Sequence, residues 1–397
     1  MLKGKTVLLG VTGSVAAYKT ANLARMIIKL GGNVHVLMTK NAENFINPFT
    51  FETLTKNKCL VDTFDRNFQY SVEHVALAKQ ADVVMIAPAS ANVIGKIANG
   101  IADDMLTTTV MACPCKKIIA PAMNHNMYHN PIVGDNIEKL KKFGYLIVEP
   151  EHGMLANGDM GDGRMPDEAV LFEYIIRELY PKKDFCGKRV LITAGATMES
   201  IDPVRYITNH STGKMGMELA RAASYRGADV TVVCGAVSAE APLFTNIVKA
   251  ESAEDMYNTV TAMSDDYDVI IKAAAVADYT PVSVSDEKIK KSDGEMTLEL
   301  KRTKDILKAL GEKKKDGQIV CGFSMETQNL IENSTEKLKS KNVDMICANS
   351  LVTEGAGFGT DTNIISIITK DGVENLGKLS KFGCADAILD RIGATLK

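Results

Sequence analysis

The sequence predicts an α/β protein made of two parallel-sheet domains, and three observations support this fold class. The chain of 397 residues exceeds one ordinary hydrophobic core and suggests about two domains. Apolar, strand-like runs alternate with amphipathic helical runs from end to end, which is typical of parallel sheets covered by helices. The pattern also restarts, because a Lys-x-Val-Leu run, a glycine-containing turn and a helix occur from residue 5 and again from residue 188.

The first domain is expected over residues 1–185. Its helix AYKTANLARMIIKLG places Leu23, Met26, Ile27 and Leu30 on one face. A second helix, DEAVLFEYIIRELY, precedes a charged linker, PKKDFCGK, that ends the domain. The predicted strands are the apolar runs KTVLLGVT, NVHVLMT, DVVMIAPA, KKIIAPAM and YLIVEP.

The second domain is expected over residues 186–397. Its predicted strands are RVLITAG, DVTVVCG, DVIIKAAAV, QIVCGFS, DMICAN and NIISIIT. About 20 residues, ATMESIDPVRYITNHSTGK, separate its first strand from the next helix, and connections of that length are usually functional. Ligands of open α/β sheets bind beyond the carboxyl ends of the strands, so we expect a site there in each domain.

Composition favours a cytoplasmic protein that acts on small molecules. The net charge of −3 gives no electrostatic footprint for nucleic acid or an anionic membrane. No apolar run reaches the roughly 20 residues of a membrane span, and the first residues enter a strand without a signal-peptide pattern. The eight cysteines are scattered and form no CxxC pair, as expected in a reducing compartment.

Two histidines suggest a metal only weakly. His125 and His129 have the i, i+4 spacing that suits zinc. The sequence offers no glutamate beside them and no third ligand nearby. We therefore expect surface or hydrogen-bonded histidines.

Polar residues follow the first three predicted strands. GVTGSVA places Gly13 and Ser14 at the start of a helix, where backbone N–H groups favour an anion, although any such fold needs a tight turn there. The spacing is not GxGxxG and the next strand ends in Thr39 rather than an acid, which favours a mononucleotide over a dinucleotide. Ser90 and Asn92 follow the third strand, where helix capping is the alternative role.

Three further features of the first domain stay open on the residues alone. Asn124 follows the fourth strand in PAMNHNMY. His74, in YSVEHVALAKQAD, is either a general base or a residue of a helix surface, and composition favours the surface. Residues 155–165, LANGDMGDGRM, are too small and polar to form part of the core, so we expect a loop that holds a ligand or presents one of its residues to a site.

Taken in order, these motifs resemble those of the FMN-dependent cysteine decarboxylases, specifically the phosphopantothenoylcysteine decarboxylase half of the bifunctional coenzyme A biosynthesis proteins. The resemblance covers residues 1–180 and includes GSVA, PASAN, ADDMLT, PAMNHNMY and GDMGDGRMPD. It implies a flavodoxin-like, HFCD-type flavoprotein domain that forms trimeric cores with FMN at their interfaces. It also implies that His74 assists deprotonation of the substrate thiol and that Asn124 holds the substrate carboxylate. The FMN-binding residues it implies are Gly13, Ser14, Thr39, Ser90 and Asn92.

The same resemblance identifies residues 155–165 as a mobile flap over the substrate. In the chemistry that it implies, FMN oxidises the thiol to a thioaldehyde, the acid loses CO₂ to give an enethiol, and reduced flavin converts that to the aminothiol. The usual flap pattern is Ala-Cys-Gly-Asp-x-Gly-x-Gly-Arg-Met, in which the cysteine is the acid of the reductive half. Asn157 stands in the cysteine position here, and an amide cannot supply a proton as a thiol can. We expect oxidation and decarboxylation without completed reduction.

The second domain carries weaker individual motifs. NHSTGKMG fails the Walker A pattern and leaves a glycine-bearing turn that is adequate for phosphate. AAAVADY runs through small residues to Asp278, which permits close approach of a base or ribose; a packed strand with a capping aspartate is the alternative. Lys288 belongs to the run EKIKKSDG, for which a solvated surface is the usual explanation. Lys337 and Lys341 lie on one side of a helix.

In order, TAGAT, IDPVRYITNHSTGKMG, AAAVADY, KIKK, DIL, GFSMET and KLKSKNVDMICAN resemble the CTP-dependent phosphopantothenate–cysteine ligase domain, a Rossmann-like α/β fold, over about 186–397. The resemblance implies transfer of CMP from CTP to phosphopantothenate, release of pyrophosphate, and displacement of CMP by cysteine. Mg²⁺ is expected to arrive with the nucleotide, and its protein ligands stay unassigned. Asn209, Asp202 and Arg205 are expected to serve the acyl-cytidylate. The implied nucleotide residues are Asp278, Lys288, Lys304, Asp305, Ile306, Leu307, Phe323, Lys337 and Lys341.

The sequence therefore predicts a bifunctional enzyme of coenzyme A biosynthesis, with dimeric ligase domains that could join trimeric cores into a dodecamer. One alternative is a ligase joined to a flavin-binding domain without full decarboxylase turnover. Another is a nicotinamide-dependent oxidoreductase, against which the missing GxGxxG and downstream acid argue.

Overall fold

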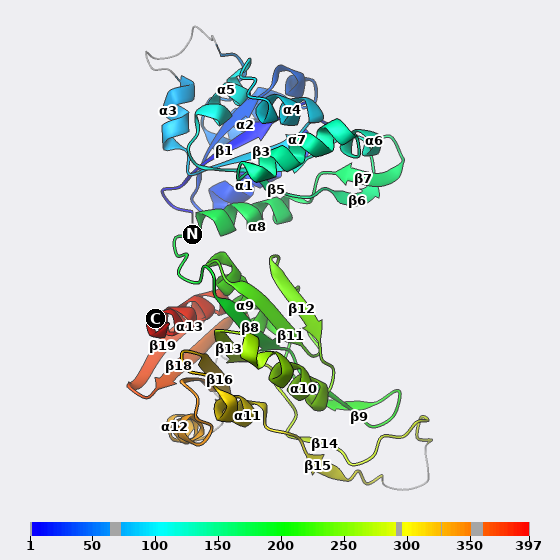
Figure 1. Ribbon diagram of the computed structural model, residues 1–397, viewed down its shortest axis with the longest axis vertical. Coiled ribbons are helices and arrows are strands. Elements are labelled where there is room, and N and C mark those ends of the chain that lie inside the picture. The colour runs from blue at the N-terminus through cyan, green and yellow to red at the C-terminus, as the bar shows by residue number, and fades with distance from the viewer. Residues whose placement is uncertain (1, 64–72, 291–295, 327, 351–359, 397) are drawn as a thin grey trace. The chain divides into compact units, whose positions relative to one another are not determined.

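A computed structural model describes residues 2–63, 73–290, 296–326, 328–350 and 360–396 (Figure 1). The chain separates into two units, Met1–Pro181 and Lys182–Lys397. Residues 291–295, which follow KIK and complete the predicted lysine run, lie outside the described part. None of the described helices is long and apolar enough to cross a membrane.

The first unit contains the predicted parallel sheet. Its strands lie in the order β2-β1-β3-β4-β5, and every neighbouring pair is parallel. All residues of the central β3 are buried, as its continuous apolar sequence requires. The strands are β1 (Thr6–Val11), β2 (Asn33–Met38), β3 (Val83–Ala89), β4 (Lys116–Pro121) and β5 (Leu146–Ile147).

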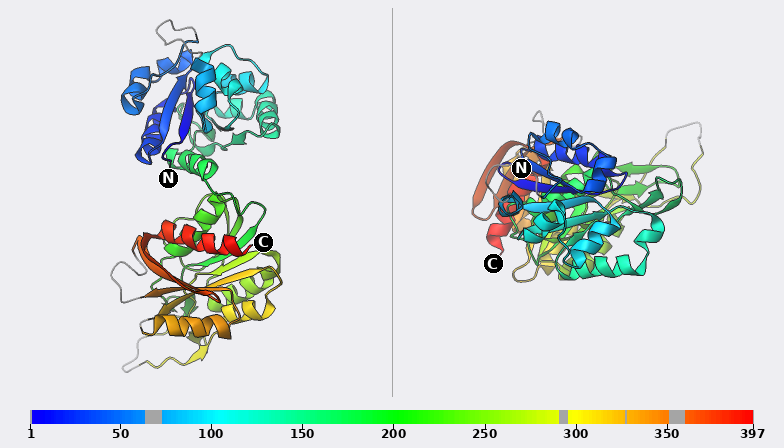
Figure 2. Two further views of the ribbon diagram at one scale, coloured as in Figure 1. Left: turned by 90° about the vertical axis from the view of Figure 1, so that its left-hand side faces the viewer. Right: turned by 90° about the horizontal axis from the view of Figure 1, so that it is seen from above.

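Helices cover both faces of this sheet (Figures 1 and 2). The predicted apolar face of α1 (Ala17–Lys29) buries Leu23 and Ile27, and α8 (Glu168–Leu179) packs beside it. The opposite face is covered by α4 (Ala91–Ala98), α5 (Met105–Ala112) and α7 (Pro131–Lys142), whose apolar residues share one core with the sheet. Shorter elements are η1 (Lys40–Asn44), α2 (Pro48–Thr55), α3 (Glu73–Gln80) and α6 (His125–Tyr128).

The segment predicted as a loop at 155–165 is part of an antiparallel hairpin. Strands β6 (Glu151–Met154) and β7 (Met160–Arg164) pair across a turn at 155–159. Gly163 has φ of +119°, and a Cβ there would lie 2.2 Å from the carbonyl oxygen of Met123. The carbonyl oxygen of Gly163 in turn accepts a hydrogen bond from Met123 N at 3.0 Å. The glycine therefore permits close approach of β7 to the segment after β4.

The second unit contains an eight-stranded sheet in the order β12-β11-β8-β13-β16-β17-β18-β19. The first six strands are parallel, as expected, but β18 and β19 are antiparallel. Between β18 and β19 only Lys370 and Asp371 intervene before Gly372, whose φ is +146°, so a tight hairpin joins them. The strands are β8 (Arg189–Ala194), β11 (Asp229–Cys234), β12 (Thr245–Lys249), β13 (Val269–Lys272), β16 (Ile319–Glu326), β17 (Met345–Ser350), β18 (Thr362–Thr369) and β19 (Gly372–Ser380).

Two helical layers enclose the second sheet (Figures 1 and 2). Helices α9 (Lys214–Tyr225) and α13 (Lys381–Thr395) share one apolar core with it. Helices α10 (Ala253–Met263), α11 (Ile306–Lys313) and α12 (Leu330–Ser340) share a second core on the other face. The remaining elements are η2 (Ser264–Asp266) and the short strands β9 (Met198–Ser200), β10 (Tyr206–Thr208), β14 (Tyr279–Pro281) and β15 (Leu300–Arg302), which pair as two hairpins.

A buried arginine ties the beginning of the second unit to its last helix. Arg226 follows α9 and is only 1% exposed. Its Nε donates to Asp184 at 2.8 Å, and its Nη1 donates to Asp386 at 3.0 Å and to Asp390 at 2.9 Å. The guanidinium also lies 5.0 Å from the ring centroid of Phe185. The positive charge of Arg226 therefore lies beside one carboxylate at the start of the unit, that of Asp184, and two on α13.

We expect Arg226→Met to destabilise the second unit by about 1–3 kcal/mol, because it removes a buried cation from three partly exposed carboxylates, two of which also lie near Lys182. Urea unfolding followed by far-UV circular dichroism measures this, since the chain has no tryptophan to report by fluorescence. Arg189→Met is the matched control: Arg189 is 53% exposed, lies 3.8 Å from Asp266, and should change stability by less than about 1 kcal/mol. Equal losses in the two variants would contradict the assignment.

Candidate functional sites

The first unit has a cavity of about 500 Å³ at the carboxyl ends of its strands. Three segments form its walls: the turn between β1 and α1, the residues after β4, and the β6–β7 hairpin. Its lining includes Ser14, Lys19, Asn124, Asn157 and Arg164.

Backbone hydrogen bonds hold the strand ends of the first unit together. Thr39 N donates to the carbonyl oxygen of Val11 at 3.0 Å, which places the end of β2 beside the first turn. Ser90 N donates to Thr12 Oγ1 at 2.9 Å, and that hydroxyl donates to the carbonyl oxygen of Pro88 at 2.7 Å. Parallel pairing thus brings Thr39 and Ser90 to either side of the first turn.

Two features of this strand edge fit a bound polar ligand. Thr39 is 8% exposed, and its Oγ1 is a buried oxygen without a hydrogen-bond partner in the described chain. An unmade bond of this kind costs about 1–3 kcal/mol, which a ligand hydroxyl or phosphate would recover. A Cβ on Gly13 would lie 2.8 Å from the Cβ of Asn41, so the glycine lets the turn pass close to the segment after β2.

The cavity also contains the two predicted amides. Asn124 begins α6, and its Oδ1 accepts from Asn126 N at 2.9 Å. Asn157 lies at the tip of the hairpin, and its Nδ2 donates to Asp159 Oδ2 at 2.6 Å. Lys19 and Arg164, which sequence reasoning missed, add two cations to the lining. The position of Lys19 on the first helix after the glycine turn was the available signal.

Of the residues predicted for the first domain, Ser14, Asn124 and Asn157 line this cavity. Gly13, Thr39, His74, Ser90 and Asn92 do not line it within one chain. Ser90 caps α4 and accepts from Val93 N at 3.5 Å, so the capping alternative holds for its side chain. Asn92 is exposed on α4, and His74 is half-buried on α3.

The second unit has a strongly cationic cavity of about 420 Å³ beside β13, α11, β16 and α12. Eight of the nine residues predicted for the nucleotide line it: Asp278, Lys304, Asp305, Ile306, Leu307, Phe323, Lys337 and Lys341. Lysine and arginine outnumber aspartate in the lining by five to two. The surplus of cations suits a polyanionic ligand.

Ion pairs fix several of these side chains. Asp305 begins α11 and accepts from Lys308 N at 2.9 Å, while Lys341 donates to its other oxygen at 2.5 Å. Lys337 Nζ lies 3.4 Å from Ser324 Oγ and 3.9 Å from Glu326 Oε1. The geometry confirms that Lys337 and Lys341 project from the same side of one helix end into the cavity.

Lys272 is a cation of this cavity that sequence reasoning missed. It ends the apolar strand β13, and its Nζ donates to the carbonyl oxygen of Ala274 at 3.1 Å. Burial, with a smaller contribution from the charge of Lys337, lowers the pKa of Lys272 to about 8. A lysine that ends a strand otherwise made of valine and isoleucine was the signal in the sequence.

Asp202 and Arg205, predicted to act on the acyl-cytidylate, lie outside the lining of the cationic cavity. Arg205 Nε donates to Asp202 Oδ2 at 2.9 Å, and this pairing holds the pKa of Asp202 well below its usual range. The pair also holds Ile289, whose N donates to Asp202 at 3.2 Å and whose carbonyl oxygen accepts from Arg205 at 2.9 Å. It forms a clamp between the long connection after β8 and the segment that carries Lys288.

The two remaining predicted residues also lie outside the lining. Lys288 is exposed on the segment that the clamp holds. Asn209 Nδ2 donates to the carbonyl oxygen of Ala275 at 3.0 Å, which places it beside the chain that leaves β13.

Comparison with known proteins assigns both halves of the chain. Residues 1–180 match the Flavoprotein family, and residues 185–396 match the DNA/pantothenate metabolism flavoprotein C-terminal domain. The coenzyme A biosynthesis bifunctional protein CoaBC of Bacillus subtilis is 46% identical over 100% of this chain and 98% of its own length. CoaBC of Vibrio cholerae is 40% identical over 98% of each chain. A crystal structure of the C-terminal domain of a CoaBC protein is 44% identical, covers 54% of this chain and 98% of its own, and has a TM-score of 0.47.

The fold, the two cavities and the family matches define a flavoprotein-type α/β domain followed by a domain of pantothenate metabolism. The chain belongs to the family of bifunctional coenzyme A biosynthesis proteins CoaBC. It is accordingly an enzyme that combines a decarboxylase with a ligase, which confirms the family and enzyme class predicted from the sequence.

We expect the affinity of the cationic cavity for inorganic tripolyphosphate to fall as the pH rises through 8. Lys272 is protonated below its pKa of about 8 and neutral above it, so the association constant should drop by up to about tenfold per pH unit above that value. Isothermal titration calorimetry between neutral pH and about pH 9 measures the slope.

Lys272→Met should bind tripolyphosphate more weakly at neutral pH and with a flatter pH dependence. Lys308→Met is the control, because Lys308 is 58% exposed, pairs with Glu312 at 3.8 Å, and lies outside the lining. The same slope in wild type and Lys272→Met would exclude Lys272 as the titrating group.

Proposed function

We propose that residues 186–397 join phosphopantothenate to cysteine with CTP, and that residues 1–185 use FMN to decarboxylate the phosphopantothenoylcysteine so formed. The observation that carries the ligase assignment is the cationic cavity, lined by eight of the nine predicted nucleotide residues. Membership of the CoaBC family supports the proposal that one chain carries both activities. We include in this proposal the substrates, FMN, CTP and the role of each residue.

FMN fits the first cavity. The glycine turn at Gly13 and Ser14 would receive its phosphate at the start of α1, and the unpartnered hydroxyl of Thr39 would donate to it. Lys19, across the turn, would add positive charge. When bound, FMN accepts an electron pair from the substrate thiol and supplies one for the final reduction.

The side chains of the first domain then have separate roles toward the substrate. Asn124 would donate from its amide to the substrate carboxylate, because its Oδ1 is already engaged by Asn126 N. His74 would take the thiol proton as a general base. Because His74 and Asn92 lie outside the single-chain cavity, we propose that a second copy supplies them in a trimeric core.

In the ligase domain, Lys337, Lys341 and Lys272 would neutralise the triphosphate, with Mg²⁺ carried by CTP. Asp278 and Phe323 would frame the nucleoside, and Asn209 would donate to the acyl-cytidylate. The Asp202–Arg205 clamp would act as a positioning pair for the segment of Lys288. Dimeric ligase domains, a dodecamer and a cytoplasmic location complete the proposal.

A ligase joined to a flavin-binding domain without full decarboxylase turnover is the second candidate, and one observation favours it. The described lining of the first cavity contains no cysteine, and Asn157 lies in the flap. The side chain of Asn157 is bonded to Asp159 and has no proton of thiol acidity to give.

We expect the protein to release CO₂ from phosphopantothenoylcysteine and to accumulate the oxidised enethiol rather than phosphopantetheine. Asn157→Cys should convert the product to phosphopantetheine, because a thiol near neutral pH can supply the missing proton. Mass spectrometry of an anaerobic reaction separates the two products. Asn157→Ser is the matched control, since it removes the amide without adding an acidic group.

Rapid, stoichiometric phosphopantetheine formation by the unaltered chain would refute this expectation and show that another residue donates the proton. Absence of CO₂ from both the unaltered chain and Asn157→Cys would instead remove the decarboxylase proposal.

Asn209→Ala should lower kcat/KM for CTP- and cysteine-dependent coupling by about 100-fold or more, as expected when a donor to a reacting oxyanion is lost. Flavin content should not change. Pyrophosphate release and product formation measure coupling, and Asn246→Ala, an exposed position on β12, is the control. Normal coupling by Asn209→Ala would remove the role assigned to Asn209.

A further inference from the structure

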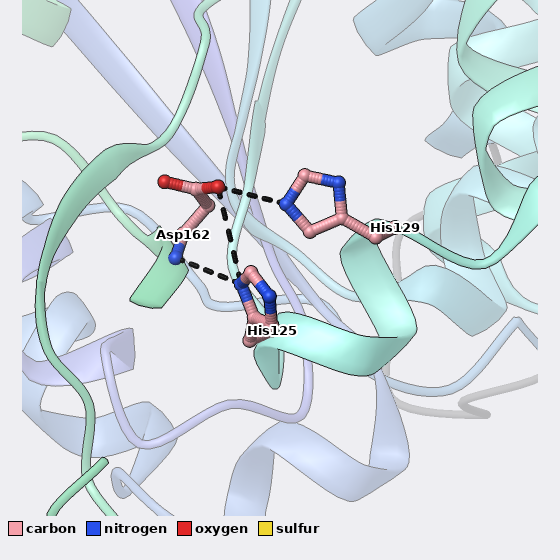
Figure 3. A group of neighbouring side chains, drawn as sticks. All are labelled: His125, His129 and Asp162. Carbon is pink, nitrogen blue, oxygen red and sulfur yellow. Dashed lines mark hydrogen bonds and ion pairs between the residues drawn. The ribbon is translucent and has the colours of Figure 1, made fainter. Parts of the chain in front are cut away.

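Three of the six histidines of the chain gather around one carboxylate of the flap hairpin. His129 Nε2 lies 2.7 Å from Asp162 Oδ2, and His125 Nδ1 lies 3.9 Å from the same oxygen. His152 Nδ1 lies 2.9 Å from the other oxygen, Oδ1. Figure 3 shows His125 at the start of the short helix α6 and His129 just after its end, both facing Asp162 on β7.

The local fold explains why these side chains meet. Asn124 caps α6, and the i, i+4 spacing then places His125 and His129 on the same side of that helix. A Cβ on Gly161 would lie 3.0 Å from the His125 ring, so the glycine lets β7 pass directly over α6. Asp162 N donates to His125 Nδ1 at 3.1 Å. This nitrogen has one lone pair, so an ion bound to it would replace that hydrogen bond.

The expected surface or hydrogen-bonded histidines are confirmed, but the sequence missed the nearby carboxylate that could be a third ligand. Asp162 is 33 residues beyond His129, and only the return of the hairpin brings it to the pair. One ligand atom from each of His125, His129 and Asp162 lies within 4.8 Å of the other two.

These separations are larger than those around a coordinated ion at one of the two pairs with Asp162. Ligand atoms about 2.0–2.2 Å from a metal are roughly 3 Å from one another, and the two measured distances to Asp162 Oδ2 fall on either side of that value. Small side-chain rotations on an exposed helix and hairpin would equalise them. His152, on the other carboxylate oxygen, is placed to orient Asp162 as an outer partner.

The ligand set selects a class of metal. Two imidazoles and one carboxylate suit Zn²⁺ and Co²⁺, whereas Mg²⁺ and Ca²⁺ prefer all-oxygen sites.

We propose that His125, His129 and Asp162 bind one Zn²⁺-class divalent ion that fastens the flap hairpin to α6. The ion would join β7 to the helix that Asn124 begins, and would therefore restrict the flap at its base. This inference adds a metal site to the proposed function and does not depend on it, because binding needs neither flavin nor substrate.

The test uses untagged full-length protein stripped of metal with EDTA and dialysed. Zn²⁺ titrated against a colorimetric chelator should show one equivalent bound per chain, and Co²⁺ should give visible d–d bands in the same protein. His129→Gln and Asp162→Asn should each lower Zn²⁺ affinity at least tenfold. Glutamine can still hydrogen-bond Asp162. His129→Gln therefore keeps a hydrogen bond between the end of α6 and the hairpin while removing the imidazole ligand.

His35→Gln is the matched control, because His35 lies on β2, hydrogen-bonds with Asn33, and should leave the equivalent of Zn²⁺ in place. Melting temperatures in EDTA confirm that each variant is folded, and Asp162→Asn provides a second test if His129→Gln is not. Zn²⁺ binding that is absent, or equally tight in wild type and both ligand variants, would overturn the proposal. The cluster would then only join the hairpin to α6 by hydrogen bonds. Flavin content and coupling activity would be unaffected by that outcome.

Discussion

Parallel pairing of the strands is the constraint on which both sites depend. In a parallel sheet the carboxyl ends of all strands lie on the same side of the sheet. Residues that follow different strands, far apart in the chain, therefore become neighbours there. In the first unit, the bonds from Thr39 to Val11 and from Ser90 to Thr12 join three such ends. In the second unit, β13 and β16 pair side by side, and they bring Lys272 and Phe323 to one cavity.

Close approach of backbone is the second requirement, and glycine supplies it at the flap. Gly161 and Gly163 alternate with Asp162 and Arg164 along β7, so one face of the strand presents no side chain to the segment after β4. Gly161 lies against the His125 ring, Asp162 N donates to His125 Nδ1, and Arg164 lines the cavity. The glycines therefore let the hairpin pack closely on the segment after β4, in addition to any backbone flexibility that they give the flap.

Sequence patterns predicted the features that depend on one continuous stretch of the chain. Apolar runs located the parallel strands, and the i, i+4 spacing placed Lys337 and Lys341 on one side of a helix. Only the family resemblance predicted that they serve the nucleotide, and both line the cationic cavity. The patterns could not predict pairings that depend on the returning chain, such as the hairpin at 155–165 or the antiparallel β18. They also missed Lys272, because its role depends on burial beside Lys337 rather than on a motif.

The flap tip shows how local structure and chemistry compete for one position. Asn157 Nδ2 donates to Asp159 Oδ2 at 2.6 Å, and Asp159 N lies 3.3 Å from Asn157 Oδ1. An asparagine that bonds to the chain two residues on stabilises a tight turn, and a cysteine has no equivalent pair of groups. Asparagine at this position therefore stabilises the turn of the hairpin, whereas cysteine would supply an acid at the cost of those bonds. In the proposed decarboxylase reaction, Asn157 would therefore order the flap tip without supplying the proton for the final reduction.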